Sequence, residues 1–422
     1  MSPESPWIFR YVLDSTQRTY FPTVTIDGNL MRLYCTINSS SFNELNKKMP
    51  RDLRIDACRG FALVMILIDH IAGNALGHYT MWNYGFCDAA DLFVFLSGYS
   101  VWLAYGRTIE KHGPDGGWRR GLNKISRRWV TIYIYQLLTV FSGVLIARLW
   151  IHFFNAPKDF IEPILTDSWR WVRSFLIFRT LPEKFNILPL YSVLLALSPI
   201  IIGLYRVKPL LLIMVSAGFW IGANFFPSFN LHNNLNPAGW FFNPFGWQFI
   251  FTLGMLTSVV ALKRNGSLKS IRSMKIVASL FLLFAFFQNF PWAEWHLPTL
   301  TLFTNLPLNE KTPLAPWRVV DTLCIMYLIL SSERAKTFAR SVIVKPLILL
   351  GQNSLEVFCA GTVATIIAGV FMTRFGTSFD HQIVSNIIVF AAAFSAAWLK
   401  SGAKLKGYRG TRHQCAELSG EA

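Results

Sequence analysis

The chain has 422 residues, of which 53% are hydrophobic and only 15% are charged. Soluble domains carry roughly 25% charged residues, so this composition excludes an ordinary soluble protein and favours one that lies largely in a membrane. The formal net charge of +17 could indicate nucleic-acid binding, but membrane topology explains it better, and we expect no nucleic-acid partner.

Residues 1–50 are mixed and polar and contain no apolar run of the kind found in a cleavable signal peptide. We expect them to form an N-terminal cytoplasmic extension. A membrane domain is predicted to follow over residues 51–400, and a basic cytoplasmic tail over 401–422. The first apolar segment, near residue 57, is expected to act as an uncleaved anchor.

The first predicted span, residues 57–77, carries ionisable side chains, which are costly in a membrane and therefore mark candidate functional residues. Arg59 and His70 are eleven residues apart, so in a helix they share one face, about 16 Å apart along the axis. Asn74 continues that face and is a candidate to bind substrate or the oxyanion. His70 is the candidate general base, and Asp69, or a carboxylate from another helix, is a candidate to fix its tautomer. The alternative is a structural histidine.

The second predicted span, residues 86–105, begins with Asp88 and Asp91 on one helix face. The loop before it is short, so the first two helices are expected to be antiparallel neighbours. Asp91 is then expected near His70, where a carboxylate would raise the basicity of the imidazole and hold one tautomer. Asp88 is expected to bind acceptor hydroxyls. Alternatively, both are helix-start carboxylates that suit the positive end of the helix dipole.

Eight further apolar segments complete a fold that we expect to be all-α, a polytopic integral membrane protein with about ten transmembrane helices. They are predicted at residues 129–149, 187–205, 209–226, 244–262, 274–291, 318–332, 346–372 and 382–399. The stretch 160–180 is too charged to span. We expect it to be an interfacial amphipathic helix with Trp169 and Trp171 at headgroup depth.

The segment 346–372 contains a polar break at residues 351–354. It is predicted to be either one tilted helix or a short helix that leads into a span. Glu356 follows the break and has Gln352 four residues before it. This embedded carboxylate is a candidate substrate-binding residue, with a buried structural hydrogen bond as the alternative.

The distribution of Lys and Arg predicts the orientation of the spans. The two terminal regions and the alternate loops that would share their side hold 31 of the 40 cations. With an even number of spans, this asymmetry predicts that both termini are cytoplasmic. The six cysteines show no metal-ligand spacing, so no metal site is expected.

Several separated blocks of the sequence resemble the OpgC family. They are RIDACRGFALVMILIDHIAGN, GFCDAADLFVFLSGYSVWLAYGR, FNILPLYSVLLALSP, GWFFNPFGWQFIFTLG and LGQNSLEVFCAGT, and they occur between about residues 50 and 400. The OpgC family lies within the broader acyltransferase-3 membrane superfamily. The mark of that superfamily, an Arg and a His separated by ten residues in the first span, resembles Arg59 and His70 here.

The resemblance implies a multi-pass O-acyltransferase of the bacterial inner membrane. Such a protein moves an acyl group, succinyl in OpgC-type members, from cytoplasmic acyl-CoA to hydroxyls of an osmoregulated periplasmic glucan. We expect acyl-CoA as a co-substrate rather than a bound cofactor, and membrane lipid and a glycan acceptor as partners. Arg59 and the basic loop 119–128 are placed to bind CoA phosphates. For most of that loop the alternative, a topology signal alone, is the favoured interpretation.

Two other hypotheses remain at this point. A proton-coupled transporter or flippase of a glycan or acyl precursor could use the same embedded Asp and His residues, although no internal repeat of the kind found in many transporters is visible. The other hypothesis is a membrane scaffold without catalytic activity.

Overall fold

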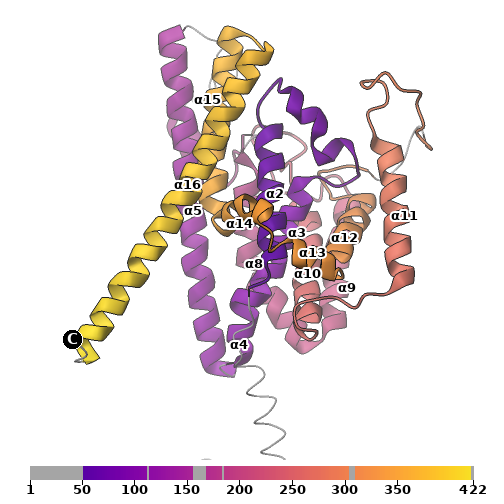
Figure 1. Ribbon diagram of the computed structural model, residues 1–422, viewed down its shortest axis with the longest axis vertical. Coiled ribbons are helices and arrows are strands. Elements are labelled where there is room, and N and C mark those ends of the chain that lie inside the picture. The colour runs from indigo at the N-terminus through magenta and orange to yellow at the C-terminus, as the bar shows by residue number, and fades with distance from the viewer. Residues whose placement is uncertain (1–50, 112–113, 155–167, 183–184, 304–308, 420–422) are drawn as a thin grey trace, which may run out of the picture. The chain divides into compact units, whose positions relative to one another are not determined.

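A computed structural model describes residues 51–111, 114–154, 168–182, 185–303 and 309–419 (Figure 1). Within these ranges the chain is helical and contains no strand, which confirms the all-α class. The predicted extension over residues 1–50 lies outside the described residues, as do the last three residues of the predicted tail.

The helices follow one another along the chain. They are α2 (Leu53–Asp69), α3 (Ala89–Val101), α4 (Arg107–Lys111), α5 (Pro114–Phe154), α7 (Ser168–Leu176), α8 (Ile187–Val207), α9 (Pro209–Phe225), α10 (Pro244–Leu262), α11 (Arg272–Asn289), α12 (Pro316–Leu330), α13 (Glu333–Phe338), α14 (Lys345–Gln352), α15 (Ser354–Phe375) and α16 (Phe379–Ser419). The 3-10 helices η1 (Ala75–Tyr79), η2 (Met81–Asn83) and η5 (Val342–Val344) and the π-helical turn η3 (Trp102–Gly106) lie between them.

A helix occupies each of the ten segments that were predicted to span a membrane. Among the described residues, five helical stretches are long and apolar enough to cross one, and they lie in α5, α8, α10, α15 and α16. The chain is therefore a helical protein with several membrane-spanning candidates, and ten crossings remain a prediction. Figure 1 shows α5 and α16 beside α15, and both helices pack against it.

Helix α2 ends earlier than the predicted span 57–77. Its last residue is Asp69 and His70 caps its C-terminus. The chain then turns through Gly73, which has a φ of +71° that favours glycine. Asn74 caps η1, so the expectation that Asn74 continues the helix face of Arg59 and His70 is wrong.

The polar break at residues 351–354 separates two helices, because α14 ends at Gln352 and α15 begins at Ser354. A short helix therefore leads into a span, as one of the two alternatives predicted. In the stretch 160–180, helix α7 presents Trp169, which is 70% exposed, but Trp171 is buried and stacks on Phe175. Only one of the two tryptophans is thus available to an interface.

Glycines bring two pairs of helices into close contact. A Cβ added at Gly60 of α2 would lie 1.9 Å from the Leu347 carbonyl oxygen of α14, and one at Gly98 of α3 would lie 1.9 Å from the Phe251 carbonyl oxygen of α10. Small residues at such crossings let helix backbones approach one another in membranes. These contacts hold α2 and α3, the helices that carry most candidate site residues, against the rest of the bundle.

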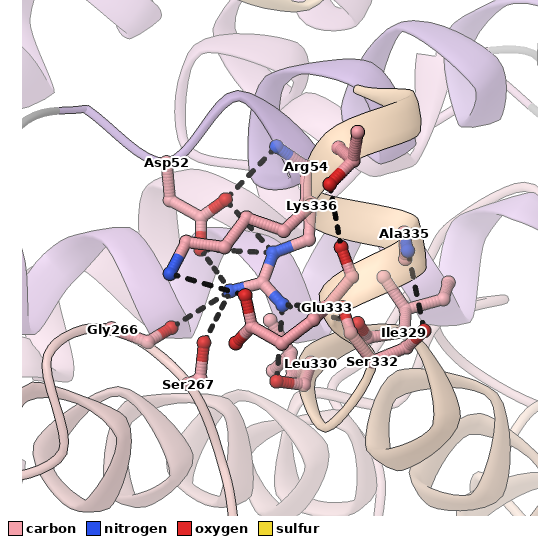
Figure 2. A network of polar contacts seen from close by, with 11 residues as sticks. Asp52, Arg54, Gly266, Ser267, Ile329, Leu330, Ser332, Glu333, Ala335 and Lys336 are labelled. Atoms are coloured by element: carbon pink, nitrogen blue, oxygen red, sulfur yellow. Dashed lines mark hydrogen bonds and ion pairs between the residues drawn. The ribbon is translucent and has the colours of Figure 1, made fainter. Parts of the chain in front are cut away.

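A buried arginine fixes the start of α2 (Figure 2). Arg54 is 2% exposed, and its guanidinium pairs with Asp52 at 2.7 Å. It also donates to the carbonyls of Gly266 and Leu330, which follow α10 and end α12. A buried charge is tolerated when it is paired and hydrogen-bonded in this way, so Arg54 ties three distant segments together.

Candidate functional site

His70 opens onto a cavity of about 260 Å³ whose polar lining includes Asp69, Asp88 and Lys311. These side chains come from the end of α2, from the N-cap of α3 and from the loop that precedes α12. The structure therefore brings together three of the residues predicted from the sequence and adds a cation that the sequence analysis did not single out.

The imidazole of His70 is oriented by the backbone of its own helix. Its Nδ1 lies 2.5 Å from the carbonyl oxygen of Ile66. Because a carbonyl oxygen only accepts hydrogen bonds, Nδ1 must carry the proton, and Nε2 is the nitrogen that can accept one. The tautomer is thus held by Ile66, whereas Asp69, the residue expected to hold it, accepts a hydrogen bond from the Thr80 hydroxyl at 2.6 Å.

Asp88 is the acidic centre of a buried ionic cluster. Its carboxylate lies 2.5 Å from Lys311 and 3.0 Å from Arg318, and it accepts from the Ala90 N–H at the start of α3. Asp88 is therefore a helix-start carboxylate, as one of the two interpretations predicted. The carboxylate is nevertheless buried and doubly paired, not solvated.

Asp91 belongs to the same cluster but is not among the described residues that line the His70 cavity. It is fully buried, pairs with Arg318 at 2.5 Å, and accepts from the Asp88 backbone N–H. Its observed partners are thus α3 itself and Arg318 of α12. Arg318 holds the Asp91 carboxylate, and the expectation that Asp91 lies near His70 stays a prediction.

A second cavity, of about 160 Å³, contains Arg59 and Arg128. Arg59 donates from Nη2 to the Leu96 carbonyl at 2.9 Å and lies 2.5 Å from the Ser100 hydroxyl. Arg128 comes from the basic segment at the start of α5. Two cations in one cavity provide a site for an anionic group such as a phosphate.

The two cavities follow the same three helices. On α3, Phe93 lines the Arg59 cavity and Ala90, about one turn before it, lines the His70 cavity. On α8, the adjacent residues Leu188 and Ile187 line the Arg59 and His70 cavities respectively. Arg59 and His70 themselves lie on α2, roughly 16 Å apart by the rise of an α-helix. A cationic cavity and a His-containing cavity thus lie in succession along α2, α3 and α8.

A protein-family model described as OpgC protein matches residues 51–404. The chain belongs to the OpgC family. Membership of that family suggests a glucan-modifying acyltransferase. No curated protein matches the chain.

Two predicted residues of this OpgC-family chain, Asn74 and Glu356, are not among the described residues that line the two cavities. Asn74 exchanges side-chain hydrogen bonds with Asn386 of α16 at 3.2 and 3.0 Å, so its amide joins η1 to that helix. Glu356 pairs with Lys400 at 2.9 Å. Gln352, expected on the Glu356 face, instead donates to Asp56 of α2 because the helix is interrupted at Asn353.

The sequence did not predict Arg318 and Lys311, the two cations that pair with Asp88 in this OpgC-family chain. A signal for Arg318 was present, since Arg318 and Asp321 are ionisable residues in the predicted span 318–332. Asp321 is buried and accepts from the Cys87 backbone N–H. Lys311 lies in a connecting segment, where a lysine carries no such signal.

Proposed function

We propose that this protein is a membrane-bound O-acyltransferase that moves a succinyl group from cytoplasmic acyl-CoA to hydroxyls of a periplasmic glucan. The observation that carries the proposal is the succession of two cavities along α2, one with Arg59 and Arg128 and one with His70. Under the predicted topology, the first faces the cytoplasm and the second the periplasm. Donor and acceptor can therefore approach one reaction centre from opposite sides.

The proposed reaction is a direct acyl transfer. His70 Nε2 takes the proton of a glucan hydroxyl, and the oxygen attacks the thioester carbon. The C–S bond then breaks, and the CoA thiolate leaves and is protonated. Asp69, at the same cavity, can stabilise the imidazolium that forms.

The donor is proposed to bind at the Arg59 cavity. CoA carries phosphates, and arginine binds them through its planar, permanently charged guanidinium. Asp88 is proposed to position acceptor hydroxyls from its place at the His70 cavity. Asp91, Asn74 and Glu356 then contribute through structure, since their observed contacts are with other parts of the protein.

The test is mass spectrometry of periplasmic glucans from cells with the gene, without it, and with His70→Ala. We expect the deletion to remove the acyl mass while the glucan itself remains. His70→Ala should lower acylation by about 10²–10⁴-fold, the usual contribution of a positioned base, while the protein still accumulates in the membrane.

Two outcomes contradict the proposal. Near-normal acylation by His70→Ala would rule out the base. Loss of the whole periplasmic glucan on deletion would favour the transporter or flippase hypothesis instead.

A further inference from the structure

Lys311 is held at the His70 cavity by contacts on both its backbone and its side chain. The buried indole of Trp247 in α10 donates to the Lys311 carbonyl at 3.2 Å. The ammonium lies 5.5 Å from the ring centroids of both Phe241 and Phe242, which also line the cavity. A loop residue is thereby fixed at a defined position, with its charge at the cavity wall.

Lys311 is one of two cations that pair with Asp88. Asp88 has a second cation, Arg318, which is almost fully buried, whereas the Lys311 side chain is 34% exposed. If Lys311 turns toward a bound anion, Asp88 keeps the guanidinium and its backbone hydrogen bond from Ala90. A movement of Lys311 would be costly if it left the buried carboxylate without any partner. Asp88 would still have its partners, so that cost does not arise.

The direction from which the donor enters determines which part of it would lie next to Lys311. A thioester that approaches along α2 from the Arg59 cavity presents its acyl group first. When its carbonyl carbon reaches His70, the far end of the acyl chain extends into the cavity that contains Lys311. A dicarboxylic acyl group carries its free carboxylate at that end.

We propose that Lys311 selects a dicarboxylic acyl donor by pairing its ammonium with the free carboxylate of the acyl chain. This inference rests on the proposed function and adds the residue that distinguishes succinyl from an uncharged acyl group of the same length. The rings of Phe241 and Phe242, each with its centroid 5.5 Å from the ammonium, hold the charge beside the cavity through cation–π contacts. A carboxylate on the acceptor would have the same chemistry, so the test uses a neutral acceptor.

The experiment is a competition in membranes that contain the full-length protein. Succinyl-CoA and butyryl-CoA, both four-carbon donors, are supplied together at equal concentration with a neutral gluco-oligosaccharide. The ratio of the two products is measured, because this ratio does not depend on the amount of folded protein. The variants are Lys311→Met, Lys311→Gln and Lys311→Arg. Lys336→Met is the control, since Lys336 has a similar exposure, 35%, and an ion pair with Glu333 outside both cavities.

We expect the wild type and Lys336→Met to favour succinyl. Lys311→Met and Lys311→Gln should lower the succinyl-to-butyryl ratio by about 10- to 100-fold, the value of one hydrogen-bonded charge pair. Lys311→Arg should keep most of the preference.

An unchanged ratio in Lys311→Met and Lys311→Gln would overturn the inference and leave the acyltransferase proposal intact. If the wild type transfers neither acyl group, the proposed function is wrong and the inference falls with it.

Discussion

Asp91 and Arg318 form a buried ion pair between α3 and α12, with 2.5 Å between their closest charged atoms. Their side chains are 0% and 9% exposed. At such depth the pair is worth little compared with apolar residues of the same size, but the removal of one partner leaves an uncompensated charge. The stability of the α3–α12 contact therefore depends on keeping both residues or replacing both.

Asp91→Asn is accordingly expected to lower the free energy of unfolding by about 3 kcal/mol, the lower end of the range for breaking a buried pair, because Asp88 still faces Arg318 at 3.0 Å. The measurement is denaturant unfolding of the purified protein in detergent. Glu333→Gln is the control, since Glu333 is 76% exposed and lies 3.7 Å from Lys336, and it should change stability by less than about 1 kcal/mol. Equal effects of the two variants would contradict the argument.

Single residues also show how far the sequence predicts the site. His70 and Arg59 could be found because their spacing and their cost in an apolar segment are local properties. The Ile66 carbonyl, which orients His70, could not be found in this way. Every residue has a backbone carbonyl, so the sequence does not mark one of them as a partner. Lys311 meets Asp88 across more than 200 residues, and only the packing of α10 and the loop before α12 brings them together.

At the scale of elements, the close contact of α2 with α14 depends on the absence of a side chain at Gly60. Gly60→Ala would place a methyl group 1.9 Å from the Leu347 carbonyl oxygen, so the two helices must separate. We expect a loss of about 1–3 kcal/mol in unfolding free energy. Acyl transfer should fall as well, because α2 carries both Arg59 and His70.

The control for Gly60→Ala is Gly218→Ala. Gly218 lies in α9, and a Cβ added there meets nothing within 4 Å. It should be neutral or stabilising, because alanine favours a helix interior by about 1 kcal/mol over glycine. The same unfolding measurement applies to both, and a Gly60→Ala protein as stable as Gly218→Ala would show that the helices are not in close contact.

Helix ends were predicted less well than helix positions. The first span was predicted to reach residue 77, but the helix stops at Asp69, and the chain then turns through Gly73 in a left-handed conformation to Asn74, which caps the next element. The break before α15 was visible since residues 351–354 are polar within an apolar segment. An apolar pattern thus locates a helix, whereas its end depends on caps and turns.

For the whole molecule, the strongest prediction concerns topology. The concentration of 31 of the 40 cations on one predicted side should place the C-terminus in the cytoplasm and the loop 227–243 in the periplasm. Reporter fusions at residue 422 and within that loop are expected to report opposite sides. A fusion in the loop between α10 and α11 serves as the control and should agree with the C-terminus. The same side for residue 422 and loop 227–243 would contradict the topology.

The fixed start of α2 has a consequence for the size of the donor. Arg54 ties that helix to the segment after α10 and to the end of α12, so α2 cannot slide along its axis without breaking buried hydrogen bonds. Arg59 and His70 therefore keep their places relative to the rest of the bundle, and the geometry of their shared helix separates them by about 16 Å for eleven residues. A donor whose anionic end stays at Arg59 must carry a flexible arm of at least that length to deliver its thioester to His70. Short thioesters without such an arm must diffuse to His70 unguided.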